Sequence, residues 1–351
     1  MEQNISVNVV KIVNKRPSLV NLPVRVNIWI RPKCQRAQFE VLKKAAPSIM
    51  FLQSDGGRNE KEWNAIYKNR EIFDSEVDWN CTIYKIYADK NNGLYTMGKI
   101  VSDIIWKEVD RCLFLEDDQI PSVSCLFFHE ELLERYKNDL RIQCICSFNA
   151  LENYRDCTSD YFFSRQGSIW GCSRWRNRCI DREVVFKKAN DPYILRLLKQ
   201  RTRHNKTAWK RINAYLKNTK YEGHVAGGEF YTEFSMYGHN MLQIVPSKNL
   251  LSYVGDTSNS EHASERKLLP RAVRRLFGMK AYELEFPLKH PVFVIPDVEF
   301  EEKRNRIIGH NTPFIVFLRR IETTYYYLRE GKAKAALKKI IIRIKGGKKE
   351  S

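Results

Sequence analysis

A short apolar run followed at once by three acidic residues constrains this chain more than any other feature. Residues 112–121 read CLFLEDDQIP, and the apolar run 112–115 predicts a buried strand that ends at Glu116, Asp117 and Asp118. In open α/β sheets, ligands bind beyond the carboxyl ends of the strands. Three crowded carboxylates repel one another unless a cation or basic groups neutralise them, and a hard divalent cation shared with phosphate oxygens does so. The segment therefore predicts a metal and phosphate site, with a solvated acidic turn as the alternative interpretation.

Segments with strand and helix patterns alternate through the first 150 residues. Short apolar runs predict strands at 24–30, 48–52, 81–87, 112–115 and 142–148. Apolar residues spaced three or four apart predict helices at 35–46, 63–73, 94–109 and 123–136. This order predicts the α/β class, with a doubly wound, mostly parallel sheet flanked by helices.

The composition predicts a packed protein in a reducing compartment. The 351 residues, 43% of them apolar, suffice for one large domain with an appendage, or for two domains. The sequence has no run of eighteen apolar residues and no apolar stretch at its start, so we expect a soluble, cytoplasmic protein. Its nine cysteines include no Cys-x-x-Cys pair, which favours core thiols over disulfides or a zinc site.

The net charge of +19 is concentrated in two segments. Residues 182–220 contain twelve Lys and Arg against two acids, a charge of +10, and residues 301–351 contain fourteen against five, a charge of +9. Such local charge suits phosphate groups or an anionic surface. In this half of the chain, 193–216 predicts a long basic helix or a helix pair, 229–238 a helix and 241–245 a strand. The lysine-flanked amphipathic stripes beyond 313 predict either an interfacial membrane contact or a solvated basic helix.

Several motifs, taken in order, resemble the GT-A glycosyltransferases, and more narrowly bacterial nucleotide-diphospho-sugar transferases of the hemolysin-like type. The motifs are Arg31-Pro32, DGGR at 55–58, NGL at 92–94, LEDDQIP at 115–121, Phe163-Ser164, IWGCSRWR at 169–176, PSKNL at 246–250, and Val254-Gly255 with a following His262. The resemblance implies a GT-A domain over 1–264, with a nucleotide-binding half at about 24–150 and an acceptor half at about 151–264. Residues 265–351 would form a basic, helical C-terminal appendage.

The resemblance implies roles for the acidic residues. Asp118 matches the position that ligates the metal, and Glu116 and Asp117 match positions that touch the ribose, the sugar or metal-bound water. Asp55 matches the acid that accepts a hydrogen bond from the base or ribose, and alternatively it forms a helix cap or an Asx turn.

Further binding residues follow from the same resemblance. The candidates for base or diphosphate contacts are Arg31, Arg58 and Lys99. Trp170 suits packing against a sugar face, and Gly171 allows close approach of the backbone. His262 resembles the C-terminal histidine that reaches the metal or diphosphate, although Glu261 stands where the family usually has Thr.

An inverting transfer needs a base that takes the proton from the acceptor hydroxyl. Glu229, after the sequence AGG at 226–228, best matches the acid of the family, and Asp181 is the second candidate. The alternative role of both residues is a helix cap or a salt-bridge partner.

The sequence thus predicts an inverting glycosyltransferase of the hexosyltransferase class that uses Mn²⁺ or Mg²⁺. We expect a nucleotide-sugar donor and a glycan or lipid-linked acceptor, in the synthesis of a surface polysaccharide or lipopolysaccharide. An anionic membrane surface would be a further partner, placing the protein on the inner face of the plasma membrane.

Two alternatives remain. A nucleotidyltransferase usually has a Gly-rich loop after its first strand, and residues 30–34 contain no glycine. A basic nucleic-acid-binding protein would explain the charge, but no RNP, KH or helix-turn-helix signature is visible, so we expect no nucleic-acid partner.

Overall fold

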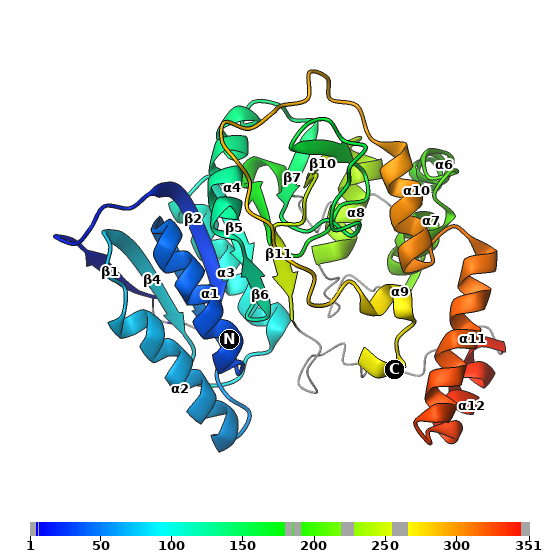
Figure 1. Cartoon of the computed structure of the whole chain (residues 1–351), viewed down its shortest axis with the longest axis horizontal. Helices are drawn as coiled ribbons and strands as arrows, with labels where there is room; N and C mark the ends of the chain where they lie inside the picture. The colour runs from blue at the N-terminus through cyan, green and yellow to red at the C-terminus, as the bar shows by residue number, and fades with distance from the viewer. Residues whose placement is uncertain are drawn as a thin grey trace.

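The core of the protein is one large sheet. The computed structural model of the chain describes residues 5, 7–179, 185, 191–218, 228–254 and 266–344. The strands of the sheet are β1 (Val7–Ile12), β2 (Val20–Asn27), β3 (Pro47–Ser54), β4 (Cys81–Tyr87), β5 (Arg111–Leu115), β7 (Ile142–Cys146), β8 (Tyr161–Ser164), β9 (Cys172–Trp175) and β10 (Leu242–Pro246). Among the described residues they pair in the order β1-β4-β3-β2-β5-β9-β7-β10-β8. Figure 1 shows β1, β4 and β2 on the left of the molecule, β5 near its centre, and β7 and β10 to the right of β5.

Most of these described strands run in one direction. β2, β3, β4, β5, β7 and β10 are parallel to one another, and β1, β8 and β9 run the opposite way. A separate small sheet pairs β6 (Gln119–Pro121) with β11 (Leu251–Tyr253) in antiparallel fashion. The fold is therefore a mixed α/β fold with a large, mostly parallel sheet, as the alternation of patterns predicted.

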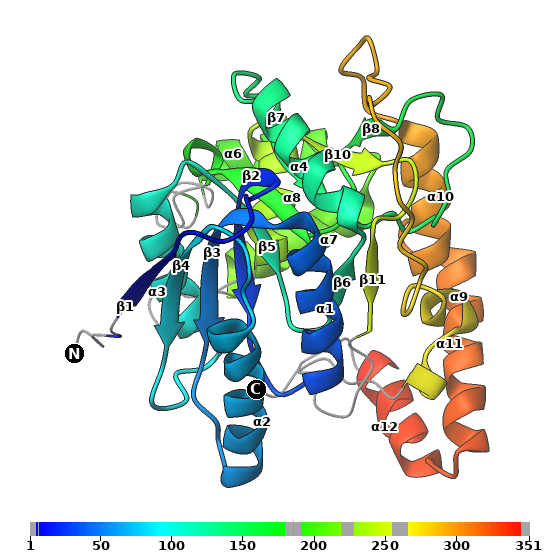
Figure 2. The ribbon, with the colours of Figure 1, turned by 60° about the vertical axis from the view of Figure 1, so that its left-hand side comes forward.

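Helices cover both faces of the sheet (Figure 2). The helices are α1 (Pro32–Ala45), α2 (Glu60–Ser75), α3 (Leu94–Glu108), α4 (Val123–Arg135), α6 (Pro192–Arg201), α7 (Lys206–Asn218), α8 (Gly228–Gly238), α9 (Arg271–Arg274), α10 (Val298–Ile308), α11 (Pro313–Arg329) and α12 (Ala333–Ile344), with 3-10 turns η1 (Arg176–Arg178) and η2 (Arg266–Leu268). Side chains alternate between the faces along a strand. Thus Met50 and Leu52 of β3 pack in the core that contains α1 and α4, whereas Phe51 packs with α3.

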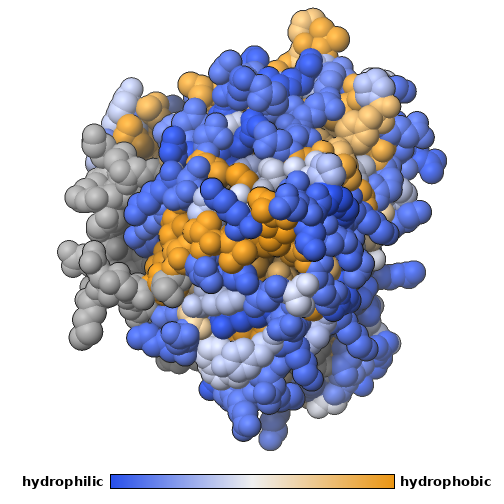
Figure 3. Space-filling view, turned by 90° about the vertical axis from the view of Figure 1, so that its left-hand side faces the viewer, coloured by the Kyte–Doolittle hydropathy of each residue, from blue (hydrophilic) through white to orange (hydrophobic). Residues whose placement is uncertain are grey.

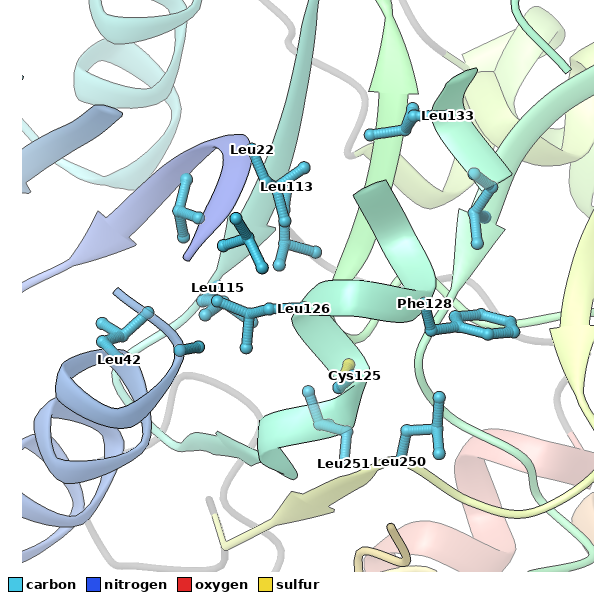
Figure 4. Close-up of a cluster of buried hydrophobic side chains, with 14 of the residues drawn as sticks. Leu22, Leu42, Leu113, Leu115, Cys125, Leu126, Phe128, Leu133, Leu250 and Leu251 are labelled. Carbon is cyan, nitrogen blue, oxygen red and sulfur yellow. The ribbon is translucent and has the colours of Figure 1, made fainter. Parts of the chain in front are cut away.

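The core between α4 and the sheet fixes the centre of the molecule. Leu126 of α4 packs in one cluster with Leu22 of β2, Leu113 of β5 and Leu42 of α1, and none of these side chains is exposed (Figure 4). Burial of a leucine contributes about 1.5–3 kcal/mol. This packing holds α1, β2 and β5 together, and the loops that follow β2 and β5 carry the candidate site.

The order of the strands reverses between β2 and β5. The chain proceeds outward from β2 through β3 to β4, and then returns to β5 on the other side of β2. β2 and β5 are parallel neighbours, with Val26 opposite Leu115. At such a reversal the connections leave in opposite directions and open a crevice at the carboxyl ends of the strands. The segments after Asn27 and after Leu115 therefore meet there.

The C-terminal part packs on the second half of the sheet. Leu276, Met279 and Leu284 belong to the main core, and Phe300 of α10 packs on Phe162 of β8 with ring centroids 4.6 Å apart. Helices α11 and α12 contact each other and η2. The division of the chain at residue 264 stays a prediction.

The predicted elements of the first half are present, with shifts at their ends. The first strand is displaced from 24–30 to Val20–Asn27, because residues 28–30 leave the sheet toward α1. The basic segment 193–216 is a helix pair, α6 and α7. The sequence analysis assigned no strand to β1, β6, β8, β9 or β11. β1 forms an antiparallel edge beside β4, and the surface on this side of the molecule carries a band of hydrophobic residues amid hydrophilic ones (Figure 3).

Candidate functional site

The three carboxylates lie in a tight turn between β5 and β6. The Gln119 N–H donates to the Glu116 carbonyl at 3.2 Å, which closes the turn around Asp117 and Asp118. The buried Gln38 amide of α1 donates to the carbonyl oxygens of Glu116 at 2.9 Å and Gln119 at 2.7 Å. Helix α1 therefore fixes the turn beyond the carboxyl ends of β2 and β5. We call residues 116–119 the acidic turn.

Two arginines face the acidic turn. The Arg25 guanidinium of β2 donates to Glu116 at 2.7 Å, and the Asn27 amide donates to the other carboxylate oxygen at 3.0 Å. Arg31, at the start of α1, donates to Asp117 at 2.6 Å and lies 3.6 Å from Asp118. Glu116 and Asp117 thus each have a close cationic partner, whereas Asp118 has a longer ion pair with an arginine that already binds Asp117.

The pKa values of the three carboxyl groups reflect this unequal pairing. Burial raises the pKa of Asp118 to about 7, and repulsion by Asp117 adds to the effect of burial against the attraction of Arg31. Burial also raises the pKa of Asp117 to about 6, with Arg31 opposing it. Burial acts to raise the pKa of Glu116 as well, but Arg25, Asn27 and Arg31 together outweigh burial and the pKa is lowered. Of the three carboxylates, Asp118 is therefore the one whose negative charge Arg25 and Arg31 compensate least.

A stacked aromatic pair and a glycine border the acidic turn. The Gln119 side-chain oxygen accepts from the Glu116 N–H at 3.1 Å and from the Gly171 N–H at 3.0 Å. Gly171 has a φ of +56°, and a Cβ there would lie 2.4 Å from Leu251 Cδ1, so the position requires glycine. The rings of Trp170 and Tyr253 stack with centroids 4.1 Å apart. Tyr253 of β11 pairs with Gln119 of β6, beside the acidic turn. Burial, and then the charge of Asp118, raise the pKa of Tyr253.

Asp55 follows β3 and holds a neighbouring loop. Its carboxylate accepts from the N–H groups of Gly56 at 2.9 Å, Asn92 at 2.9 Å and Gly93 at 2.9 Å. A Cβ on Gly56 would lie 2.3 Å from the Lys90 backbone, so the two loops touch closely. An Asx turn would bond the N–H of Gly57, two residues on, and the N-cap of α2 is Asn59, so the bonds of Asp55 instead tie the loop after β3 to the loop at 92–93. The nucleotide contact of Asp55 stays a prediction.

Two of the predicted basic contacts are engaged in local ion pairs. Arg58 pairs with Glu62 at 2.6 Å, and its guanidinium lies 5.9 Å from the Trp29 ring in the loop after β2. Lys99 pairs with Asp103 at 2.9 Å on the exposed face of α3. The Lys99–Asp103 pair is exposed on both sides, and such pairs contribute about 0–1 kcal/mol, so a phosphate could replace Asp103 at little cost. Glu62 is only 12% exposed and also accepts from the Arg58 backbone N–H at 2.8 Å, which holds Arg58 more firmly.

The remaining predicted residues are not placed beside the acidic turn. Asp181 and His262 lie outside the described residues. Glu229 is the second residue of α8, and the structure describes its backbone but not its side chain. Within the described part of the chain, no group of three or more His, Cys, Asp or Glu side chains is arranged to hold a metal ion.

The sequence analysis missed four residues that shape the site: Arg25, Gln38, Gln119 and Tyr253. Arg25 had a usable signal, because a charged residue inside the apolar strand at 24–30 needs a buried partner. Gln38 and Gln119 act through amide hydrogen bonds. Tyr253 reaches the turn because β11 pairs with β6. Nothing in the local sequence around Gln38, Gln119 or Tyr253 indicates that these residues contact the acidic turn.

Comparisons with known proteins leave the family open. No protein-family model and no curated protein sequence matches the chain. Among solved structures, the apo-form glycosyltransferase GlyE of Streptococcus pneumoniae TIGR4 is similar over 70% of this chain and 57% of that chain. The sequence identity is 13% and the TM-score is 0.25, so the similarity does not establish a shared activity.

The raised pKa of Asp118 predicts a pH-dependent loss of stability in metal-free protein. The folded state holds the Asp118 proton up to about pH 7, whereas the unfolded chain releases it near its ordinary value of 3.8. Stability therefore falls as pH rises between these values. Between pH 5 and pH 8 the free energy of unfolding of the parent protein should fall by about 2–3 kcal/mol more than that of Asp118→Asn.

Urea unfolding in the presence of a chelator measures this difference. Asp103→Asn, an exposed carboxylate paired with Lys99, serves as the control and should follow the parent at both pH values. Equal losses of stability in the parent and in Asp118→Asn would contradict the prediction.

Proposed function

We propose that the chain is a metal-dependent glycosyltransferase of the GT-A type that transfers a sugar from a nucleotide-diphosphate donor. The observation that carries the proposal is the position of the acidic turn, at the carboxyl end of β5 where the strand order reverses beside β2. Ligands of open α/β sheets bind at such reversals. Arg31 and Asp118 meet there, within 3.6 Å, and offer a cationic and an anionic contact to a diphosphate and its counter-ion.

The donor set of the acidic turn fits a hard divalent cation. Asp118 is buried, and among the described residues its ion pair is the shared, longer one with Arg31, so its carboxylate gains most from an added cation. Mn²⁺ and Mg²⁺ prefer oxygen ligands, and Mg²⁺ is usually held by one or two carboxylates together with phosphate oxygens and water. Such a cation would neutralise charge that grows on the departing nucleoside diphosphate.

The other side chains of the site would bind and orient the donor. Arg31 would turn part of its guanidinium from Asp117 toward the diphosphate, because it already lies 3.6 Å from Asp118. Arg58 and Lys99 would offer further contacts to the base or diphosphate. The stacked pair of Trp170 and Tyr253 would present an apolar wall to the sugar.

Deprotonation of the acceptor is assigned to Glu229, with Asp181 as the second candidate. Glu229 lies in the first turn of α8. An inverting transfer requires a base opposite the leaving diphosphate. Asp55 would add a contact to the base or ribose while it holds the loop at 92–93. His262 would complete the contacts to the metal or the diphosphate.

The acceptor is proposed to be a glycan or glycolipid at an anionic membrane surface. In the described part of the chain, no helix is long and apolar enough to cross a bilayer. Helix α11 instead exposes a row of apolar side chains that are 46–69% exposed: Phe314, Phe317, Leu318, Ile321, Tyr325 and Leu328. Apolar residues on one face with basic residues beside them are typical of helices that lie in a membrane interface, and the segment 301–351 has a charge of +9, from fourteen Lys and Arg against five acids.

Nucleotide binding is the direct test of the proposed donor site. With Mn²⁺ present, one of UDP, GDP, CDP and dTDP should raise the melting temperature. At a nucleotide concentration of a hundred times Kd, binding increases the free energy of unfolding by about 2.7 kcal/mol. The shift should disappear without metal and in Asp118→Ala, and it should persist in Asp103→Ala. Absence of a shift with all four nucleotides would overturn the proposal and direct attention to nucleic acid as the ligand of the basic segments.

Membrane contact is tested by sedimentation with vesicles that contain anionic lipid. Replacing Phe317 and Ile321 together by Glu should reduce the bound fraction at least several-fold, because both side chains are more than half exposed on α11. The matched control replaces Val13 and Leu19 by Glu, which are as exposed but lie at the N-terminal edge of the sheet. Equal binding of the two double variants would contradict the membrane contact of α11.

A further inference from the structure

A fully buried histidine is connected to the loop that borders the acidic turn. His129 lies on α4, which packs on β7 and β9, and it has no exposed surface. Its Nε2 lies 2.7 Å from the hydroxyl of Ser147, which follows β7, and its Nδ1 lies 2.7 Å from the hydroxyl of Ser173 in β9. Burial lowers the pKa of His129 to about 3. The imidazole is therefore neutral near pH 7, with one donor nitrogen and one acceptor nitrogen.

The direction of each hydrogen bond follows from the Gly171 carbonyl. A carbonyl can only accept, so the Ser147 hydroxyl donates its single hydrogen to Gly171. The Ser147 oxygen therefore accepts from His129, which assigns the ring proton to Nε2. Nδ1 is then the acceptor and takes the hydrogen of the Ser173 hydroxyl. The Cys125 thiol also donates to the Ser147 oxygen, at 3.3 Å, so this hydroxyl uses its hydrogen and both lone pairs.

Gly171 connects the serine to the acidic turn. Its carbonyl also accepts from the Ser147 N–H at 2.9 Å, and its own N–H donates to the Gln119 side-chain oxygen at 3.0 Å. The same Gln119 oxygen accepts from the Glu116 N–H at 3.1 Å. A Cβ at Gly171 would lie 3.0 Å from Ser147 Oγ, so the loop and the serine touch directly. Hydrogen bonds thus run without interruption from His129 to the backbone of the acidic turn.

Ser147 and Ser173 differ in one respect that makes them a matched pair. Neither side chain is exposed, and each hydroxyl contacts one ring nitrogen of His129 at the same distance. The Ser173 hydroxyl gives its hydrogen to His129, whereas the Ser147 hydroxyl gives its hydrogen to Gly171. Loss of the Ser173 hydroxyl therefore removes one buried hydrogen bond of the ring and leaves the path to Gly171 intact.

We propose that His129 is a positioning residue of the donor site, which fixes the Gly171 peptide through Ser147 and thereby the acidic turn. With its proton on Nε2 the ring can only donate toward Ser147, so the serine hydrogen points to Gly171 alone. Side chains that bind a ligand keep their geometry when a further layer of hydrogen bonds holds them. The inference rests on the proposed function for what the turn binds, whereas the hydrogen bonds themselves do not depend on it.

Hydrogen exchange in metal-free protein tests the path without any ligand. Ser147→Ala should speed the exchange of the Gly171 and Glu116 amides about tenfold, because both lose their fixed geometry. Each rate is divided by that of Ile83, a buried residue of β4 that β3, β2 and β5 separate from β9, which removes the effect of a change in global stability. Ser173→Ala should leave these ratios within about twofold of the parent values. Equal changes in the two variants, or no change in Ser147→Ala, would overturn the proposal.

The role in the donor site is tested by titration calorimetry with Mn²⁺ and each of UDP, GDP, CDP and dTDP. For a nucleotide that binds the parent, Ser147→Ala should raise Kd about tenfold or more and Ser173→Ala about twofold at most, since only the first frees the acidic turn. Equal losses in the two variants would assign the serines to the stability of the fold alone and overturn the proposal. If the parent binds none of the four nucleotides, the donor site fails, and the exchange ratios still decide whether His129 holds the turn.

Two replacements of His129 separate its donor nitrogen from its bulk. A Gln side chain is long enough to place an amide N–H where Nε2 lies, whereas Asn, one methylene shorter, reaches only the place of Nδ1. His129→Gln should therefore keep the Gly171 exchange ratio and the Kd within about threefold of the parent values, and His129→Asn should change both as much as Ser147→Ala does. An equal loss in His129→Gln and His129→Asn would contradict the assignment of the donor to Nε2. Should either protein fail to fold, the serine pair still decides the proposal.

Discussion

Neutralisation of three adjacent carboxylates is the interaction on which the centre of this molecule depends. Arg25 reaches Glu116 from inside the sheet, and Arg31 reaches Asp117 from the start of α1. Both arginines can do so only because β2 and β5 are parallel neighbours that end at the same edge. The leucine core under α4 holds these strands together, so packing on one face of the sheet determines the electrostatics at its end. Asp118 retains the least compensated charge, which is why a divalent cation and a diphosphate are the ligands proposed for this place.

Local sequence patterns predicted those helices and strands in which apolar residues recur at the spacing of a helix or form a continuous strand-like run. The strand at Cys81–Tyr87 was predicted at its observed ends, and helix α3 ends one residue earlier than predicted. β8 and β9 could not be predicted in this way, since each has only four residues and β8 is buried on both faces without alternation. β1 exists because β4 offers it an edge. That pairing depends on residues about 75 positions away, so no local pattern of β1 announces it.

The candidate site was predictable to a similar degree, and for the same reason. The acidic turn and Arg31 follow predicted strands, and in open α/β sheets ligand-binding residues are expected at the ends of strands. The structure brings the acidic turn and Arg31 together. The contact between Gln38 and the turn, and that between Gln119 and Gly171, depend on how α1 and the loop at 170–171 pack. Asp55 illustrates the opposite case, because the sequence left two roles open and the structure places its carboxylate on the backbone of the loop at 92–93. The basic segment 193–216 forms helices α6 and α7, and only the tertiary structure shows that residues of α6 line a cavity.

The central claim is that a metal–diphosphate complex binds between the ends of β2 and β5. A crystal structure of the protein with Mn²⁺ and a nucleoside diphosphate, recorded with anomalous data, tests it most directly. The account predicts an anomalous peak within coordination distance of the Asp118 carboxylate, with the diphosphate beside Arg31. A nucleotide bound elsewhere, or ordered nucleotide with no metal peak at Asp118, would contradict it.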